Sequence, residues 1–381
     1  MHQTSPAAAA AKKRGEASAY AAITRLGLRN FRNYGEASFE AHTKHVAITG
    51  PNGIGKTNLL EAISLFSPGK GLRNAPAEEW HRNGSNGPVG LHLTLEDAAH
   101  ITLQHNPGDK RKRLTYQDAP VTTQADMTEI LSVVWLTPQM DGLFLEDAAA
   151  RRKFFDRLIY AAHPEHAAHL QRYEHALRQR NKALKERASD AVIRAWNPLI
   201  VAEGVAIAAA RLEKTRALNE AFATMRTPFP LPHLGWRGTV EQCLAESTAL
   251  GTEELYAMQL ETNLEQDRML GQTRLGVHRS DVATRHRDKD IPVSQCSTGE
   301  QKALLTALVL AHASWLKQLE PQRPLIILLD DIVAHFDDKR REQLFRWIEE
   351  LSAQVWMTGT NANDFASLQQ AQVLELQNIN R

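Results

Sequence analysis

Cysteine and aromatic residues are both scarce in this sequence. Only Cys243 and Cys296 occur among the 381 residues, far apart along the chain. Two such thiols provide neither a disulfide scaffold nor a cysteine-based zinc site, and this sparing use of cysteine fits a reducing cytoplasm. Aromatic residues make up 6% of the chain and are not interleaved with its basic clusters. Base stacking on single-stranded nucleic acid is therefore unsupported.

An excess of charge and long hydrophobic runs are also missing. The chain has 45 Lys and Arg against 44 Asp and Glu, a net charge of +1, so any affinity for nucleic acid must come from local patches. No stretch approaches the roughly 18 consecutive apolar residues of a membrane span. Residues 1–22 are rich in Ala but lack the apolar run of a signal peptide. We expect a disordered N-terminal tail there and a cytoplasmic protein.

The rest of the chain predicts an α/β protein with a helical insertion. Hydrophobic residues at 43% and charged residues at 23% exclude global disorder. Strand-like segments alternate with helical ones near both ends, whereas the middle is rich in helix-favouring Ala, Leu, Glu, Arg and Lys. We predict the first part of an α/β head with an antiparallel meander at 23–140, an inserted helical arm at 141–270 and the second part of the head at 271–381. Within the arm, the proline-rich segment 226–239 predicts an interruption between helices.

The clearest motif is a glycine-rich loop between a predicted strand at 45–49 and a helix at 56–66. It matches the pattern G-x-x-x-x-G-K-[ST]. Glycines let successive backbone N–H groups surround a phosphate, and the helix N-terminus adds a favourable dipole. Lys56 would reach the β- and γ-phosphates, and the Thr57 hydroxyl would ligate Mg²⁺. The predicted ATP-binding residues are Gly50, Pro51, Asn52, Gly53, Ile54, Gly55, Lys56 and Thr57, with Asn58 after them.

An acidic pair follows the uniformly apolar strand predicted at 325–329. A carboxylate at the carboxyl end of a buried parallel strand lies beside such a phosphate loop. Asp330 would hold the hydration shell of Mg²⁺, and Asp331 would polarise the attacking water. With the glycine-rich loop, this pair predicts an ATPase that uses ATP and Mg²⁺.

A further short motif indicates the class of ATPase. Ser297, Thr298, Gly299 and Glu300 stand at the predicted start of a helix, between the two motifs above. A capped helix start of this kind is common, but its position in the chain resembles that of the signature motif of ABC-type ATPases with SMC-like heads. In that family the motif of one subunit caps the γ-phosphate bound to the other. The resemblance implies a P-loop ABC/SMC-like ATPase head that closes as a dimer around two ATP molecules.

Other segments resemble the RecF family of bacterial DNA-repair ATPases, in order from Ile23 to Thr360. They are residues 23–34, 57–63, 70–73, 133–139, 151–159, 276–281 and 330–337. The resemblance adds Arg32, Asn33 and Arg73 to the expected nucleotide site and places Gln139 where ABC ATPases sense the γ-phosphate and Mg²⁺. It implies an ATP-dependent homodimer that clamps double-stranded DNA near single-strand gaps, with RecO and RecR as partners in recombinase loading.

Two departures from related ATPases predict slow turnover. Transporter ATPases have a histidine after the strand predicted here at 355–357, where this chain has Thr358-Gly359-Thr360-Asn361. Asp331 is also one methylene shorter than the glutamate typical of transporters. Both changes weaken the activation of water, so the resemblance implies a switch rather than a motor.

One segment of the resemblance is incomplete. Val277 and Ser280 replace the usual Pro and Asp of the family, so only His278, Arg279 and Asp281 are carried over to the site. A structural role in fixing the turn after the arm is the alternative for these three.

Basic residues form three clusters that could contact DNA. They are residues 110–113 at a predicted hairpin, residues 151–153 at the start of the arm, and the helical set Arg172, Arg178, Arg180, Lys182, Lys185 and Arg187. A solvated helix face is the alternative for the last set. Contact with duplex phosphates fits these clusters and would depend strongly on salt. The sequence leaves open which cluster is used.

Two other functions also stay open. The chain could be the ATPase subunit of a membrane transporter, against which stand the missing histidine and the long arm. It could also be a nucleotide-gated scaffold that binds protein partners without DNA.

Overall fold

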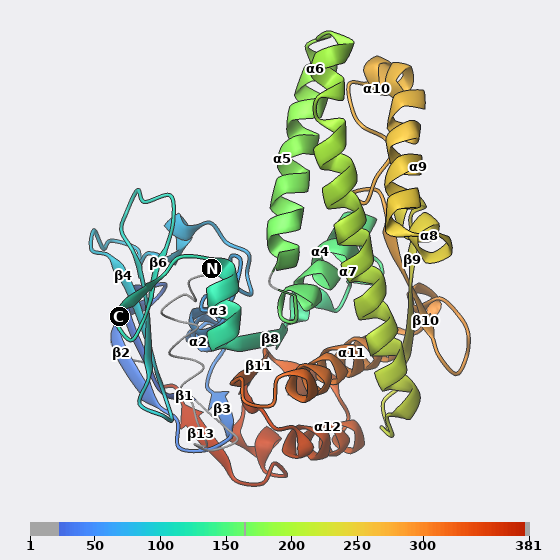
Figure 1. Ribbon diagram of the computed structural model, residues 1–381. Coiled ribbons are helices and arrows are strands. Elements are labelled where there is room, and N and C mark those ends of the chain that lie inside the picture. Colours follow the sequence, from blue (N-terminus) through green and yellow to red (C-terminus); the bar gives the residue numbers. More distant parts are fainter. Residues whose placement is uncertain (1–22, 164, 378–381) are drawn as a thin grey trace. The chain divides into compact units, whose positions relative to one another are not determined.

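The computed structural model describes residues 23–163 and 165–377, so the predicted tail at 1–22 lies outside the described residues. The chain forms two compact units (Figure 1). Of the described residues, the first comprises 23–141 and 305–377, and the second comprises those between Gly142 and Leu304. The second unit therefore includes residues 271–304, which the sequence analysis assigned to the second part of the head.

An antiparallel sheet of six strands forms one layer of the first unit. Its strand order is β2-β1-β4-β5-β6-β7. The strands are β1 (Ile23–Phe31), β2 (Tyr34–Glu40), β4 (Val89–Leu95), β5 (His100–His105), β6 (Arg113–Tyr116) and β7 (Ala119–Val121). Every second residue of β4 is buried, as expected for a sheet with one face on a core. The predicted meander belongs to this sheet.

The second layer is a parallel sheet, in which neighbouring strands all run in the same direction. Its order is β13-β3-β12-β11-β8. The strands are β3 (His45–Thr49), β8 (Ser132–Leu136), β11 (Leu325–Leu329), β12 (Gln354–Gly359) and β13 (Ala371–Glu375). Because the strands are parallel, the segments that follow β3, β8, β11 and β12 meet at one edge of the sheet.

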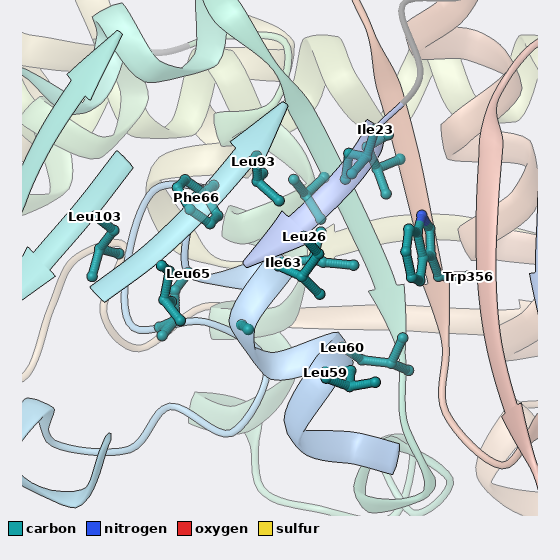
Figure 2. Packing of buried hydrophobic residues seen from close by; sticks show 14 of the residues in the cluster. Ile23, Leu26, Leu59, Leu60, Ile63, Leu65, Phe66, Leu93, Leu103 and Trp356 are labelled. Atoms are coloured by element: carbon teal, nitrogen blue, oxygen red, sulfur yellow. The ribbon is translucent and has the colours of Figure 1, made fainter. Parts of the chain in front are cut away.

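Helix α2 (Lys56–Ser64) contributes to a core shared by the two sheets of this unit. Figure 2 shows Ile63 of α2 beside Leu26 of β1, with Leu60 of α2 and Trp356 of β12 in the same cluster. This packing fixes the helix on both sheets at once. The helix begins directly after the glycine-rich loop, so the core also fixes that loop.

The remaining helices of the first unit lie between or before strands of the parallel sheet along the chain. They are α3 (Gln124–Ile130), α12 (Asp338–Glu350) and the greater part of α11 (Thr298–Leu319), with short 3₁₀ turns at Ala77–Trp80, Pro138–Met140, Ile332–His335 and Ala362–Phe365. The helix predicted to start at the Ser297 motif and the apolar strand after it are both present.

The second unit is mainly helical. Its helices are α4 (Ala148–Tyr160), α5 (Glu165–Lys185), α6 (Asp190–Arg194), α7 (Asn197–Thr224), α8 (Thr239–Glu246), α9 (Ala249–Thr262) and α10 (Leu264–Leu270). Side chains of α5, α7 and α9 share one apolar cluster. The segment α6–α7 is apolar and long enough to cross a membrane by composition alone. However, α7 carries Glu203 and Arg211, which pair with charged side chains of the same unit, so it is the core helix of this unit.

The structure adds a strand where the sequence predicted only an interruption between helices of the arm. Strand β9 (Pro232–Arg237) lies within the segment taken as a proline-rich interruption, and it pairs antiparallel with β10 (Asp281–His286). Pro232 occupies the first position of β9, where a missing N–H is tolerated. The partner strand lies far along the chain, so local sequence carries little sign of this pairing.

Candidate nucleotide site

The glycine-rich loop between β3 and α2 uses backbone conformations that side chains disfavour. Gly50, Gly53 and Gly55 have φ angles of 142°, 80° and 117°. A Cβ on Gly55 would also lie 2.6 Å from Asn33 Nδ2. Glycine at position 55 is therefore required both by conformation and by space.

Three side chains brace this loop. Asn33 Nδ2 donates to the carbonyl of Ile54 at 2.9 Å, and the Tyr34 hydroxyl donates to the carbonyl of Gly55 at 3.2 Å. Asn58 Nδ2 in turn donates to Asn33 Oδ1 at 2.6 Å. Asn33 and Asn58, which the sequence analysis placed among the ATP-binding residues, thus hold the loop backbone in this structure. Tyr34 was not predicted at the site.

Lys56 folds back onto the loop that precedes it. Its Nζ donates to the carbonyls of Gly50 at 2.6 Å and Pro51 at 3.1 Å. Burial lowers the pKa of Lys56, and the nearby carboxylates of Asp331 and Asp330 oppose that shift. The ammonium group therefore lies between the phosphate loop and the acidic pair after β11.

Asp330 joins three strands of the parallel sheet. Its carboxylate accepts from Thr57 Oγ1 at 2.9 and 3.1 Å and from Thr358 Oγ1 at 2.7 Å. Its backbone N–H donates to the carbonyl of Leu136, the last residue of β8. Burial raises the pKa of Asp330, and the hydroxyls of Thr358 and Thr57 oppose that rise. Thr358 was not predicted as a site residue. From the sequence it was only the first residue of the segment 358–361, which stands where transporter ATPases have a histidine.

The oxygen donors at this edge fit Mg²⁺. Thr57 supplies a hydroxyl and Asp330 a carboxylate within hydrogen-bond distance of each other, and Mg²⁺ prefers oxygen ligands of this kind. Gln139 lies in the 3₁₀ turn directly after β8, so its amide oxygen belongs to the same edge and its side chain is exposed. Thr57 and Asp330 would hold the ion, with Gln139 as the further oxygen donor.

Arg32 and Arg73, predicted at the nucleotide, lie beside a carboxylate of α2 in this structure. The carboxylate of Glu61, fully buried on α2, accepts from Arg32 Nε at 2.9 Å and from Arg32 Nη2 at 2.5 Å. Arg73 Nε lies 3.6 Å from the same carboxylate. Glu61 was not singled out from the sequence, because an acidic residue on a helix is usually solvated. Arg32 is thus a brace of α2 here, whereas Arg73 also lies close enough to Asp330 to lower its pKa.

The signature-like segment, in the second unit, is a capped helix start. Ser297 Oγ accepts from the backbone N–H of Glu300 at 3.3 Å, and Glu300 Oε2 accepts from the backbone N–H of Ser297 at 3.2 Å. Lys289 donates to the other oxygen of Glu300, and these bonds lower the pKa of Glu300 to about 2. Ser297 and Thr298 are exposed. The bonds between Ser297 and Glu300 fix the backbone at the start of the helix.

The residues carried over at 278–281 have internal partners. His278 Nδ1 lies 2.8 Å from the Tyr173 hydroxyl, and its Nε2 lies 3.1 Å from the carbonyl of Thr273. Asp281 accepts two bonds from Arg151, each at 2.8 Å. The alternative stated for His278 and Asp281, a structural role after the arm, fits this geometry. Arg279 is less firmly held than His278 and Asp281, because its guanidinium donates a long bond of 3.3 Å to the exposed side chain of Gln272.

The basic clusters separate into buried and exposed members. Lys112 donates to the carbonyl of Leu65, burial lowers its pKa to about 8, and it is therefore no DNA contact. Arg180 is fully buried against Asp267 at 2.7 Å. Several other members of the two arm clusters also have partners within the unit, namely Arg151 with Asp281, Arg152 with the carbonyl of Ser280 and Arg172 with Glu203. Lys110, Arg111 and Arg113 of the β5–β6 hairpin remain exposed.

A strand, a glycine-rich loop, a helix and a carboxylate on a neighbouring parallel strand define the P-loop ATPase class. The family model described as the RecF/RecN/SMC N terminal domain matches residues 22–378. The chain therefore belongs to the RecF branch of this ATPase family, as two relatives show. The DNA replication and repair protein RecF of Mesorhizobium japonicum is 42% identical over 356 residues, which cover 91% of this chain and 93% of the relative. The RecF protein of Rhizobium meliloti is 39% identical over 370 residues, covering 93% and 97%.

Solved structures support the same fold. A structure described as the recombination mediator protein RecF-ATPrS in the RecFOR pathway has a TM-score of 0.83 at 20% identity, covering 94% of this chain and 96% of that chain. A second, described as RecF-ATP in the same pathway, has a TM-score of 0.79 and covers 92% and 95%. The fold class and the family predicted from the sequence are confirmed.

Proposed function

We propose that this chain is an ATP-dependent DNA-binding protein of replication and gap repair. ATP joins two copies head to head, the closed dimer clamps double-stranded DNA near a single-strand gap, and slow hydrolysis releases it. The observation that carries the proposal is the presence of two half-sites on one chain: the loop with Thr57 and Asp330, and the exposed helix start at Ser297. The named relatives and their pathway support RecO and RecR as partners.

The first half-site would bind the nucleotide. Lys56 would exchange the carbonyls of Gly50 and Pro51 for the β- and γ-phosphates, which are stronger acceptors for its charge. A bound Mg²⁺ neutralises part of the negative charge of the phosphates. Thr57 would turn from Asp330 towards the ion, Asp330 would hold its hydration shell, and Asp331 would orient the attacking water.

The second half-site would complete the first in another copy. The free N–H groups at the start of α11 and its dipole favour an anion, here the γ-phosphate of the partner copy. The bonds between Ser297 and Glu300 hold this helix start in shape before any partner arrives. Neither copy alone would then present a full set of contacts to ATP, which makes ATP the link between the two.

Replacement of Ser297 by Arg is expected to block dimerisation without loss of ATP binding. The long charged side chain would occupy the space of the γ-phosphate and the partner surface. Light scattering after size exclusion should show a dimer of the unsubstituted protein with ATP and Mg²⁺, and a monomer of the variant. An equal dimer in both proteins would contradict the proposed arrangement. ATP affinity, measured separately, serves as the control and should not change.

The β5–β6 hairpin is the basic cluster that we assign to DNA. Lys110, Arg111 and Arg113 are exposed, and among residues 23–163 and 165–377 an ion pair is formed by Arg113 alone of the three, with Asp109 at 3.6 Å. On helix α5, the exposed Arg178 and Lys182 each face a glutamate on the same helix. Lys185 and Arg187, at and just after the end of α5, are exposed as well, and we prefer the hairpin because its three exposed cations lie within four consecutive positions.

Charge reversal of Lys110 and Arg111 to Glu is expected to weaken duplex binding by at least about tenfold. Because each lost phosphate contact releases about 0.9 fewer counterions, the slope of log affinity against log salt should fall by about 2. The matched control reverses Arg178 and Lys182 on α5, which should change both quantities less. Unchanged affinity and slope in the hairpin variant would exclude this cluster as the DNA contact.

A further inference from the structure

The hydroxyl of Thr358 connects the two acidic residues that follow β11. Thr358 lies near the end of β12 and is 1% exposed. Its Oγ1 donates to Asp330 Oδ1 at 2.7 Å and accepts from the backbone N–H of Asp331 at 2.8 Å. One buried hydroxyl thus uses its donor and its acceptor on neighbouring residues of the acidic pair.

The first bond decides which oxygen of Asp330 is available to a metal. Thr358 donates to Oδ1, which Thr57 Oγ1 also approaches at 2.9 Å, whereas Oδ2 accepts from Thr57 alone among the described residues, at 3.1 Å. If Thr57 turned towards a bound Mg²⁺, Oδ1 would keep its bond to Thr358. That bond would hold the carboxylate in one orientation and leave Oδ2 as the oxygen available to the ion or to its hydration shell.

The second bond fixes the backbone at Asp331. This residue has a φ angle of 50°, in the left-handed region that residues with a Cβ disfavour. The Asp331 N–H bonded to Thr358 supports that conformation. Because the backbone direction determines where the side chain begins, the same bond sets the place of the Asp331 carboxylate.

We propose that Thr358 is a positioning residue that orients both Asp330 and Asp331 for Mg²⁺ and water. The inference rests on the proposed ATP-binding function and adds a residue to its site. Thr358 acts through a hydroxyl on the metal-facing carboxylate, so its role differs from that of a histidine that senses phosphate. A side chain that supports a metal ligand in this way commonly changes metal affinity by about 10- to 100-fold when it is removed.

The test compares Thr358→Val with Thr358→Ser. Valine keeps the shape of the side chain and removes the hydroxyl, whereas serine keeps the hydroxyl. Binding of fluorescent ADP is titrated with Mg²⁺, and again in EDTA. We expect Thr358→Val to require 10- to 100-fold more Mg²⁺ with unchanged ADP affinity in EDTA, and Thr358→Ser to restore the Mg²⁺ dependence to within about threefold of the unsubstituted protein.

Thr49 offers a matched control on the neighbouring strand. It pairs in register with Gly359, is 2% exposed, and its Oγ1 has no hydrogen-bond partner among the described residues. Thr49→Val is the same chemical change at the same sheet edge, and it should leave the Mg²⁺ dependence unchanged. The melting temperature of each variant checks that the fold is retained.

Three outcomes would overturn the inference. An unchanged Mg²⁺ dependence of Thr358→Val would show that the hydroxyl does not position the carboxylates. An equal loss in Thr358→Ser and Thr358→Val, or in Thr49→Val, would show that packing is the cause. If the unsubstituted protein binds no nucleotide, the proposed function itself fails, and that result is distinct from the first two.

Discussion

Replacement of Lys56 by Ala is expected to abolish ATP binding at micromolar concentrations. The lysine is the cation closest to the phosphate loop, where its Nζ already lies within 3.1 Å of two loop carbonyls. Removal of one partner of a buried charge pair costs about 2–5 kcal/mol, and the lower bound corresponds to about 30-fold weaker binding. Isothermal calorimetry with ATP and Mg²⁺ measures the loss.

Lys112 provides the control for this substitution. It lies beyond the opposite end of α2, where its Nζ donates to the carbonyls of Leu65, Ser67 and Gly69. Lys112→Met removes a half-buried lysine that binds carbonyls just after the end of α2, without a change at the phosphate loop. ATP affinity should remain within about threefold in this variant. Retained ATP binding in Lys56→Ala would contradict the assignment of the loop.

Replacement of Arg211 by Leu is expected to lower the stability of the second unit by about 3–5 kcal/mol. Arg211 lies between Asp156 and Glu241, with both carboxylates 2.9 Å from its guanidinium and all three side chains buried. Burial opposes ionisation of Asp156, but Arg211 and His166 outweigh it and lower its pKa to about 2. The variant would therefore leave two buried carboxylates without their cation at neutral pH.

The loss is measured as a shift of the urea midpoint, followed by circular dichroism. Arg178→Ala is the matched control, because Arg178 faces Glu174 at 3.6 Å in an exposed pair on the same unit. Such pairs contribute about 0–1 kcal/mol, so the midpoint of the control should scarcely move. Equal midpoints for Arg211→Leu and the unsubstituted protein would show that the buried network does not hold this unit together.

The sequence predicts the head well where structure is local and periodic. The apolar strand at Leu325–Leu329 and the helix after the glycine-rich loop follow directly from residue pattern, and both are present. Strand β9 was missed because it forms only through β10, which lies far along the chain and supplies every ladder partner. Prolines near β9 gave the opposite local signal, and long-range pairing outweighed it.

For the nucleotide site, the sequence predicts which segments come together but not the partners of individual side chains. Motif spacing brings the glycine-rich loop and Asp330 to one sheet edge, but it does not show what each side chain binds. Arg32 is predicted at the nucleotide, and in this structure it binds Glu61, a carboxylate that becomes buried when α2 packs on both sheets. Thr358 carries no motif at all. Its one sequence signal is a polar residue at the carboxyl end of a predicted parallel strand.

The central claim is that ATP controls DNA binding by joining two copies of this chain. Fluorescence anisotropy of a labelled duplex, without nucleotide, with ADP and with ATP, tests it most directly in the unsubstituted protein and in Ser297→Arg. Tight binding with ATP alone, lost in Ser297→Arg, is the predicted result. Equal binding in all three states, or none in any, would contradict the clamp and leave an ATPase head without a DNA-repair role.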